Sequence, residues 1–312
     1  MIDPLTEVVT LLQPQAKFSK VVSAAGPWRV RRSGSGQLFY CVILDGSCRL
    51  EVDGHEQIQL QQGDFVLIPS AYSFTMSSLE PPASEELDMP PVPLADGEFR
   101  HGAQDVPPDV QLLVGHCSFG SPDAALLVSL LPQLVHVRGE KRLAILVQLV
   151  GEESRAARPA RDVILARLLE VLLIEALRSV EGTDAAPGLL RGLADERLAV
   201  AIRRIHENMT KPWTVAQLAK EAALSRSAFF ERFSRALGVA PMEYLLAWRM
   251  ALAKNLLRRQ EAGVSEVAER VGYGSASAFS VAFTRHVGLP PARYAREQSE
   301  LQRPQRASSS VF

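Results

Sequence analysis

The sequence predicts an α+β protein, with an N-terminal β-barrel that carries a helical appendage and a C-terminal all-α domain with two helix-turn-helix units. Three observations predict this class. Short β-branched and aromatic runs occur between Val21 and Thr75, the spacing of apolar residues becomes helical after about residue 120, and the net charge changes sign between Ala194 and Asp195. The 312 residues are enough for two domains, each with its own core.

The strand-rich part is expected to be a small barrel or sandwich. The runs FYCVIL, CRLEV and DFVLIPS consist of residue types that pack well in sheets. They are separated by turn-forming pairs at Asp45-Gly46, Asp53-Gly54 and Gly63-Asp64. The segment from Glu80 to Asp109 is rich in proline and acids, so we expect a long loop there that is either exposed or sparsely structured, followed by one more strand at VQLLVGHCSF.

Helices are expected after that strand. ALLVSLLPQLVHV is helical but broken at Pro132, and KRLAILVQLVGEE forms the next helix. RDVILARLLEVLLIEALRSVE follows, and its stretch from Val163 to Leu177 is apolar on almost every side. Such a helix is buried either in its own domain or in a contact between subunits, so a homodimer is one hypothesis. EGTDAAPGLLRG is typical of a hinge.

These patterns predict a first domain at residues 1–180, a linker at 181–194, a helical domain at 195–298 and a flexible tail at 299–312. The charge follows the same division. Residues 1–194 hold 16 Lys and Arg against 24 Asp and Glu, or −8, whereas residues 195–312 hold 18 against 11, or +7. A basic surplus of this kind indicates either a nucleic-acid partner or a merely solvated helical surface.

The helical domain contains one pattern twice. Val215 to Ala223 leads through a tight turn into SRSAFFERFSRALG, and Val264 to Val271 leads through Gly272-Tyr273-Gly274 into SASAFSVAFTRHVG. Each copy has a short helix, a turn, a Ser at the start of a second helix, Phe on its inner face and a closing Gly. In a helix-turn-helix unit the second helix enters the DNA major groove. Phe at four-residue spacing also occurs in ordinary helical cores, but two copies in the basic half favour DNA.

The last residues, about 100 in all, resemble the AraC-type transcription regulators. The segments G-V-A-P-M-E-Y-L, R-M-A-L-A, V-G-Y-G-S-x-S-x-F and G-L-P-P-x-R-Y carry this resemblance. It implies that outward positions of both second helices contact bases, while arginines such as Arg232 hold phosphates. The DNA-binding residues expected from it are Arg226, Ser227, Phe230, Glu231, Arg235, Arg249, Ser275, Ala276, Ser277, Ser280, Val281, Thr284 and Arg285.

Two of these positions are unusual for base contacts. Phe230 offers only packing against a thymine methyl or a sugar, and Val281 offers no hydrogen bond. We therefore expect the first unit to carry more sequence specificity than the second. If both second helices meet one face of the DNA, they should lie about one turn apart, ~34 Å.

The first domain resembles a cupin barrel, a fold that often precedes the AraC-type module, through the segment G-S-C-R-L-E-V-D-G-H-E-Q-I-Q-L-Q-Q-G-D-F-V-L-I-P. Cupins that bind a metal are expected to show two His one residue apart, and this sequence has no such pair. Phe74 stands where a further His commonly follows. We therefore expect no metal, no cofactor and no catalytic site. The remaining histidines of this part are isolated: His55, His101, His116 and His136.

The three cysteines, Cys41, Cys48 and Cys117, all lie in the first domain. If Asp45-Gly46 is a two-residue hairpin turn, Cys41 and Cys48 are diagonal neighbours about 7–8 Å apart. They are then either small buried apolar residues or a redox switch. Arg29, Arg31 and Arg32 either attract an anion or lie along a solvated strand edge.

Together these patterns predict a sequence-specific, DNA-binding transcription regulator whose cupin-like domain senses a small molecule or a redox signal. One alternative is a cupin-type enzyme with an accessory helical domain, and a second is a purely architectural or RNA-binding protein, which would lack sequence preference. The expected partners are double-stranded DNA, an unidentified effector, a second copy of the chain and, for an activator, RNA polymerase. The N-terminus shows no export signal and no apolar run is long enough to span a membrane, so we expect a cytoplasmic location.

Overall fold

The computed structural model describes residues 3–32, 37–69, 73–82, 90–94, 98–121, 123–155, 158–179, 188–260 and 262–302. The chain divides into two compact units. The sheet unit comprises residues 8–120 and 124–190, and the helical unit comprises residues 1–7, 121–123 and 191–312. The predicted linker 181–194 and tail 299–312 lie partly outside the described residues. Their described parts are helical, in α5 (Leu189–Ala194) and α12 (Pro291–Gln302).

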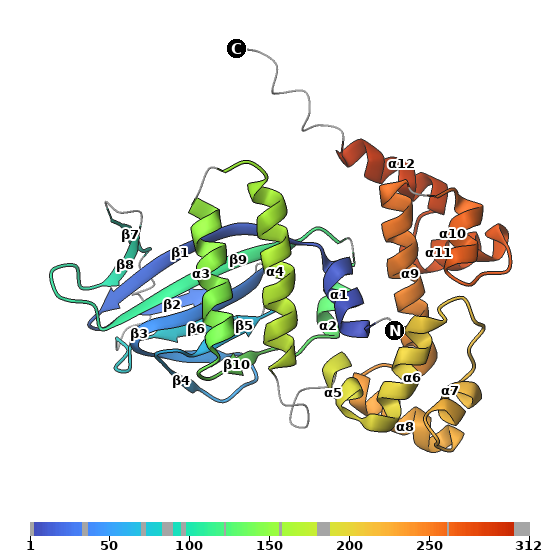
Figure 1. Cartoon of the computed structure of the whole chain (residues 1–312), viewed down its shortest axis with the longest axis horizontal. Coiled ribbons are helices and arrows are strands. Elements are labelled where there is room, and N and C mark those ends of the chain that lie inside the picture. The colour runs from blue at the N-terminus through green and yellow to red at the C-terminus, as the bar shows by residue number, and fades with distance from the viewer. Residues whose placement is uncertain are drawn as a thin grey trace, which may run out of the picture. The chain divides into compact units, whose positions relative to one another are not determined.

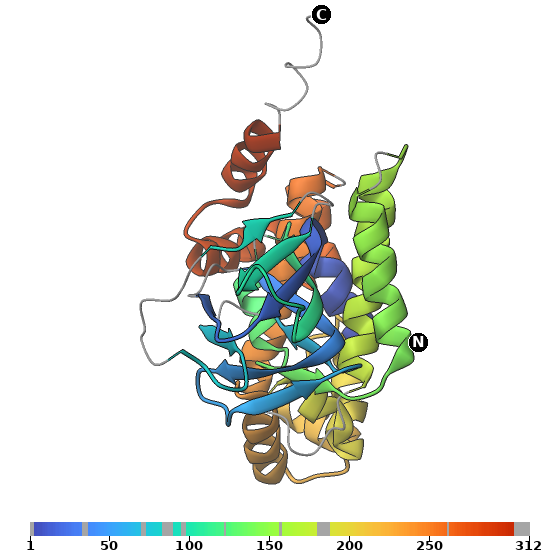
Figure 2. The same ribbon diagram turned by 90° about the vertical axis from the view of Figure 1, so that its left-hand side faces the viewer.

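A strongly curled sheet forms the sheet unit, in agreement with the predicted β-barrel (Figures 1 and 2). Its main path runs β10-β5-β3-β9-β1-β8-β7, while β2, β4 and β6 pair beside it. Inward side chains from several strands form one apolar core that includes Phe39, Leu50, Val66 and Leu112. The strands are β1 (Pro14–Ala25), β2 (Arg29–Arg32), β3 (Leu38–Val52), β4 (Ile58–Gln61), β5 (Phe65–Ile68), β6 (Phe74–Ser77), β7 (Val92–Pro93), β8 (Phe99–Gly102), β9 (Val110–Phe119) and β10 (Val135–Val137).

The hairpin turn predicted at Asp45-Gly46 is wrong, because β3 continues through it as a single strand. Pairing with β9 shifts register between Ile43 and Asp45 and then resumes. Gly46 has φ +74°, and a Cβ there would lie 1.9 Å from the Asp109 carbonyl oxygen. This bulge bends the strand instead of reversing it. Glycine at position 46 therefore allows β3 to approach the backbone at Asp109 closely, and it does not form a hairpin turn.

Two further expectations need correction. The segment 80–109 is not wholly a loop, since β8 pairs in parallel with β1 and carries β7 at its edge. Proline and acid content marked the segment as irregular, but its short strand is held by partners distant in sequence. The stretch after Pro132 is not helical either, because residues 135–137 form β10, which pairs with β5.

Helices cover one outer face of the curled sheet. The figures show α3 (Lys141–Arg155) and α4 (Arg161–Arg178) side by side across it, and both contact β1 (Figures 1 and 2). The buried stripe of α4 includes Leu165, Leu169 and Leu172. The shorter helices are α1 (Pro4–Leu12), whose residues from Val8 onward belong to this unit, and α2 (Ala124–Ser129).

The described part of the helical unit contains no strand, as predicted. Its two helix pairs are joined by the 19-residue helix α9, and another core of Phe and aliphatic side chains fills the second pair. The helices are α6 (Glu196–Glu207), α7 (Val215–Glu221), α8 (Arg226–Leu237), α9 (Pro241–Arg259), α10 (Val264–Arg270), α11 (Ala276–Val287) and α12.

Candidate nucleic-acid interface

The first helix-turn-helix unit consists of α7 and α8. Thr214 and Gln217 form a reciprocal capping box that starts α7. The turn between the helices is closed by the Leu224 amide, which donates to the Ala219 carbonyl at 2.9 Å. Ser225 then caps α8 by accepting from the Ala228 amide, and Gly238 ends the helix with φ +79°.

The second unit, α10 and α11, repeats this construction. The Tyr273 amide donates to the Ala268 carbonyl at 2.8 Å, as Leu224 does to Ala219 in the first copy. Ser275 caps α11 through the Ala278 amide, and Gly288 ends it with φ +82°. The serine starts and glycine ends predicted from the repeat are therefore confirmed in both copies.

Aromatic side chains on the inner face of each second helix anchor it to the domain. Phe229 and Phe233 are fully buried with ring centroids 5.4 Å apart, and Phe279 and Phe283 are buried at the same separation. In the second copy Phe283 also meets the ring of Tyr294 edge-on. Burial of these rings fixes which face of each helix points outward.

The opposite faces of α8 and α11 are solvent-exposed. Phe230 is 45% exposed and Val281 71%. The Thr284 hydroxyl donates to the Ser280 carbonyl at 2.7 Å, and the Ser275 and Ser277 hydroxyls lie 3.1 Å apart. The remaining predicted positions are exposed or half-buried: Arg226, Ser227, Glu231, Arg235, Ala276 and Arg285.

Two of the arginines expected at phosphates have partners inside the unit. Arg249 donates to the Met209 carbonyl at 2.7 and 3.1 Å and to the Lys211 carbonyl at 2.8 Å. Arg232 forms an ion pair with Asp195, the residue that caps α6. Sequence spacing had marked both as cations on the basic domain, but it contains no information about which carbonyls or acids they meet.

Sequence reasoning also did not predict that two acidic residues from earlier parts of the chain pair with side chains of the helical unit. The imidazole Nδ1 of buried His206 contacts the Glu7 carboxylate, and its Nε2 lies 2.7 Å from the Tyr244 hydroxyl. The ammonium of Lys254 pairs with Asp123. Nothing local marks Glu7 or Asp123 as members of this unit, because both are more than 100 residues away from their partners.

The thiols of the sheet unit are all buried. Cys41, Cys48 and Cys117 have no exposed surface and form no disulfide. Cys41 and Cys48 are seven positions apart, an odd offset that would place them on opposite faces of a regular strand, yet they share one core because the bulge in β3 reverses the alternation between them. Burial raises the pKa of Cys48 to about 12, and it raises the pKa values of Cys41 and Cys117 above the ordinary value as well.

The histidines of this unit do not converge on a metal site. His136 lies 3.0 Å from the Asp64 carboxylate, and His55 lies 3.2 Å from the Gln133 amide oxygen. In the parts of the chain that the structure describes, no three His, Cys, Asp or Glu side chains come together as a metal centre requires. The same parts contain no helix with both the length and the apolar character of a membrane span.

Comparison with known proteins covers both units. The family described as "Cupin" matches residues 3–181, and the family described as "Helix-turn-helix domain" matches residues 218–297. A protein of Streptomyces lividans whose name places it among the AraC-like transcription regulators is 38% identical over 299 residues, which are 94% of this chain and 97% of that protein. The chain belongs to the AraC-type family of transcription regulators.

Other AraC-type relatives agree with this assignment. A similarly named protein of Streptomyces antibioticus is 36% identical over 94% of this chain and 98% of its own. The HTH-type transcriptional regulator AlkR of Acinetobacter baylyi is 29% identical over 89% and 94%. The solved DNA-binding domain of AdpA in complex with a target DNA is 34% identical and covers 34% of this chain and 96% of its own, with a TM-score of 0.32. The two family matches and the two Streptomyces relatives confirm the predicted family, cupin-like fold and helix-turn-helix domain.

Proposed function

We propose that this AraC-type regulator binds double-stranded DNA sequence-specifically through the outward faces of α8 and α11. The observation that carries the proposal is the matched construction of the two units, in which buried Phe pairs hold each second helix and leave a continuous exposed face. A major groove about 12 Å wide admits such a helix. The exposed residues on these faces include side chains of the kind that contact bases and phosphates.

The roles within this surface differ. Arg226, Arg235 and Arg285 are exposed cations and supply phosphate contacts, which set affinity without sequence. Phe230 packs on thymine methyl groups, while Val281 contributes contact without hydrogen bonding. The role of Arg249 is to brace the loop at Met209 and Lys211, and the first unit carries more of the base specificity than the second.

The sheet unit, in the same proposal, senses a small-molecule signal. The sequence predicts either a small-molecule signal or a redox signal. Burial of the three thiols favours the small molecule, because burial disfavours the thiolate and the thiolate is the form that reacts with oxidants. In the same proposal the chain acts as a cytoplasmic regulator and not as a cupin-type enzyme, which the names of relatives that match 94% of the chain support. If it is an activator, RNA polymerase is its further partner.

Selection of bound duplexes from random DNA by the full-length protein tests the DNA-binding proposal. We expect one enriched motif with two half-sites about one helical turn apart, and more information in one half-site than in the other. Because each phosphate contact releases counterions, affinity for this motif should fall steeply with salt. Binding without sequence preference, or no binding at low salt, would contradict the proposal.

The redox route has its own test. Replacing Cys41, Cys48 and Cys117 with Ser should leave the change of DNA binding on oxidant treatment the same as in the unmodified chain. A response that disappears in the triple variant, while its DNA affinity without oxidant is retained, would establish the thiols as the sensor and overturn the small-molecule interpretation.

A further inference from the structure

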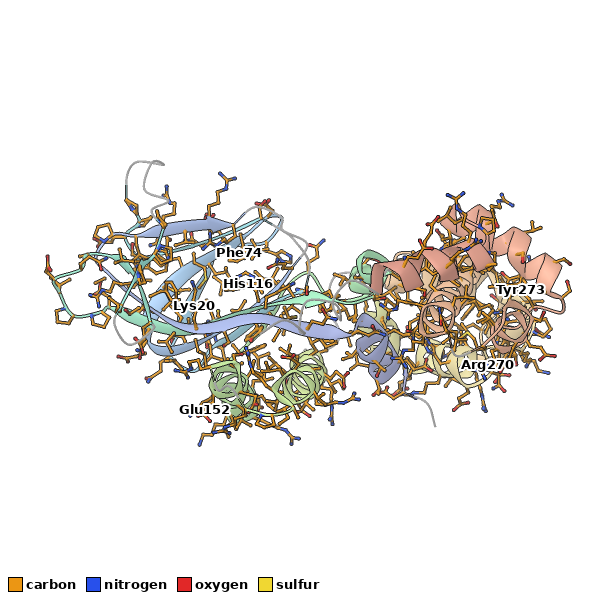
Figure 3. The ribbon with its side chains drawn as sticks, turned by 90° about the horizontal axis from the view of Figure 1, so that it is seen from above. Lys20, Phe74, His116, Glu152, Arg270 and Tyr273 are labelled. Atoms are coloured by element: carbon orange, nitrogen blue, oxygen red, sulfur yellow. The ribbon has the colours of Figure 1, made fainter. Side chains whose placement is uncertain are left out.

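An apolar cavity of about 70 Å³ lies inside the curled sheet. The residues that line it alternate along their strands, so that each strand presents one face to the cavity. From β1 come Lys20, Val22 and Ala24, and from β9 come Leu112, Val114 and His116. Figure 3 shows Lys20 and His116 together with Phe74 in this interior.

Aromatic rings pack against one another in the apolar walls of the cavity. The rings of Phe39 and Phe74 are 4.6 Å apart, and Phe39 lies 5.2 Å from the His116 ring. Trp28 is 5% exposed, and its ring is stacked with that of His101 at a centroid separation of 6.3 Å. These walls suit a hydrocarbon group, since a cavity of this kind has few polar atoms to hold water.

Basic groups gather on the polar side of the cavity. Arg32 is exposed and lines the cavity, and no ion pair of Arg32 is found among the described residues. Lys20 lies near it, with its ammonium 3.7 Å from the centre of the Phe99 ring. Burial, together with the smaller effect of the charges of Arg32 and Lys20, lowers the pKa of His116 to about 4. The site therefore has a surplus of positive charge beside an apolar volume.

Strand alternation separates Arg32 from its neighbours. Along β2, Val30 and Arg32 line the cavity, whereas Arg29 and Arg31 line a polar depression with Glu51 and Asp53. The three arginines that the sequence presented as one group thus belong to two surfaces. Of the three, only Arg32 lines the cavity.

We propose that this cavity binds a small apolar carboxylate, with its hydrocarbon part between the sheet faces and its carboxylate at Arg32 and Lys20. The proposal rests on the sensing role proposed above and gives that role a ligand class. The volume is about half that of an apolar cavity of ~150 Å³ that binds benzene, so a short chain fits better than a fused ring system. A guanidinium selects a carboxylate over a neutral amide by charge-assisted hydrogen bonds.

Calorimetric titration of the purified full-length protein tests this inference. The probes are butanoate, hexanoate and benzoate, each compared with its amide of the same size. We expect saturable binding of at least one carboxylate with an affinity at least about tenfold above that of its amide. Arg32→Met should reduce carboxylate affinity about tenfold and leave the amide unchanged, whereas Arg31→Met, one residue away on the other surface, should change neither.

Equal binding of acid and amide would overturn the proposal, as would equal effects of the two arginine variants or the absence of binding by every probe. Thermal unfolding of both variants shows that each is folded before titration. DNA binding is measured on the same preparations. Loss of DNA binding with carboxylate binding intact counts against the proposed function alone, and the reverse result counts against the ligand class alone.

Discussion

Two adjacent residues on α8 lie on opposite faces of the helix, one in the core and one in solvent. Phe229 is fully buried and contacts Phe233, whereas Phe230 is 45% exposed. One residue along a helix rotates the side chain by about 100°, so two identical rings meet the core and the solvent respectively. Because the two side chains are identical and differ only in position, they form a matched pair for mutation.

Phe229→Ala should lower the free energy of unfolding by about 3–5 kcal/mol, because it removes a fully buried ring and leaves a cavity. Phe230→Ala should change stability by no more than about 0.5 kcal/mol and reduce affinity for the selected DNA several-fold. Urea denaturation and fluorescence anisotropy measure the two quantities. A Phe230→Ala protein that binds the selected DNA normally would remove Phe230 from the interface.

The turn of the second helix-turn-helix unit depends on one glycine and one arginine. Gly272 has φ +80°, and a Cβ there would lie 2.8 Å from both Thr210 Cα and the Arg249 guanidinium. Arg249 in turn donates to the carbonyls of Met209 and Lys211. The loop after α6, helix α9 and the turn before α11 therefore pack together at this point.

Gly272→Ala should destabilise the protein by about 1–3 kcal/mol. The new methyl group would contact backbone atoms, and alanine is disfavoured in the left-handed conformation that this position adopts. Gly274→Ala is the matched control in the same turn, because no atom lies within 4 Å of a Cβ at that position. Denaturant unfolding of the two variants should differ by about that amount. Equal stabilities would show that the turn adapts without strain.

At the scale of the whole molecule, α3 and α4 leave apolar side chains in solvent. Val163 is 63% exposed and Ile145 57%, while Ile164, Leu149 and Val171 are each more than 40% exposed. One stripe of α4 is buried on the sheet unit, so the strongly apolar sequence of this helix exceeds what packing within the unit requires. Exposed apolar surface of this kind favours a contact with a second copy.

We therefore expect the protein to form a dimer at micromolar concentration and Val163→Asp to weaken it, since a charge would be buried in the contact. Val200→Asp, at an exposed valine of α6, serves as the control and should leave the oligomeric state unchanged. Sedimentation equilibrium distinguishes these outcomes. A monomeric unmodified chain, or equal behaviour of the two variants, would rule out this face as the contact.

Features that depend on neighbours along the chain could be predicted from the sequence alone. The paired helix-turn-helix pattern, the Ser225 and Ser275 caps and the inward Phe stripes were all predictable, because caps, turns and helical periodicity act over fewer than about five residues. The outward face of each second helix followed from the same periodicity.

Which groups from distant parts of the chain meet could not be predicted in this way. The bulge in β3 between Ile43 and Asp45, the parallel pairing of β8, the carbonyls that engage Arg249 and the partners Glu7 and Asp123 all involve segments far apart in sequence. Alternation alone places Arg31 and Arg32 on opposite faces of β2, but which face meets the cavity depends on how the strands pair. Contacts of this kind depend on how strands and helices pack in three dimensions, and a local pattern contains no information about that packing.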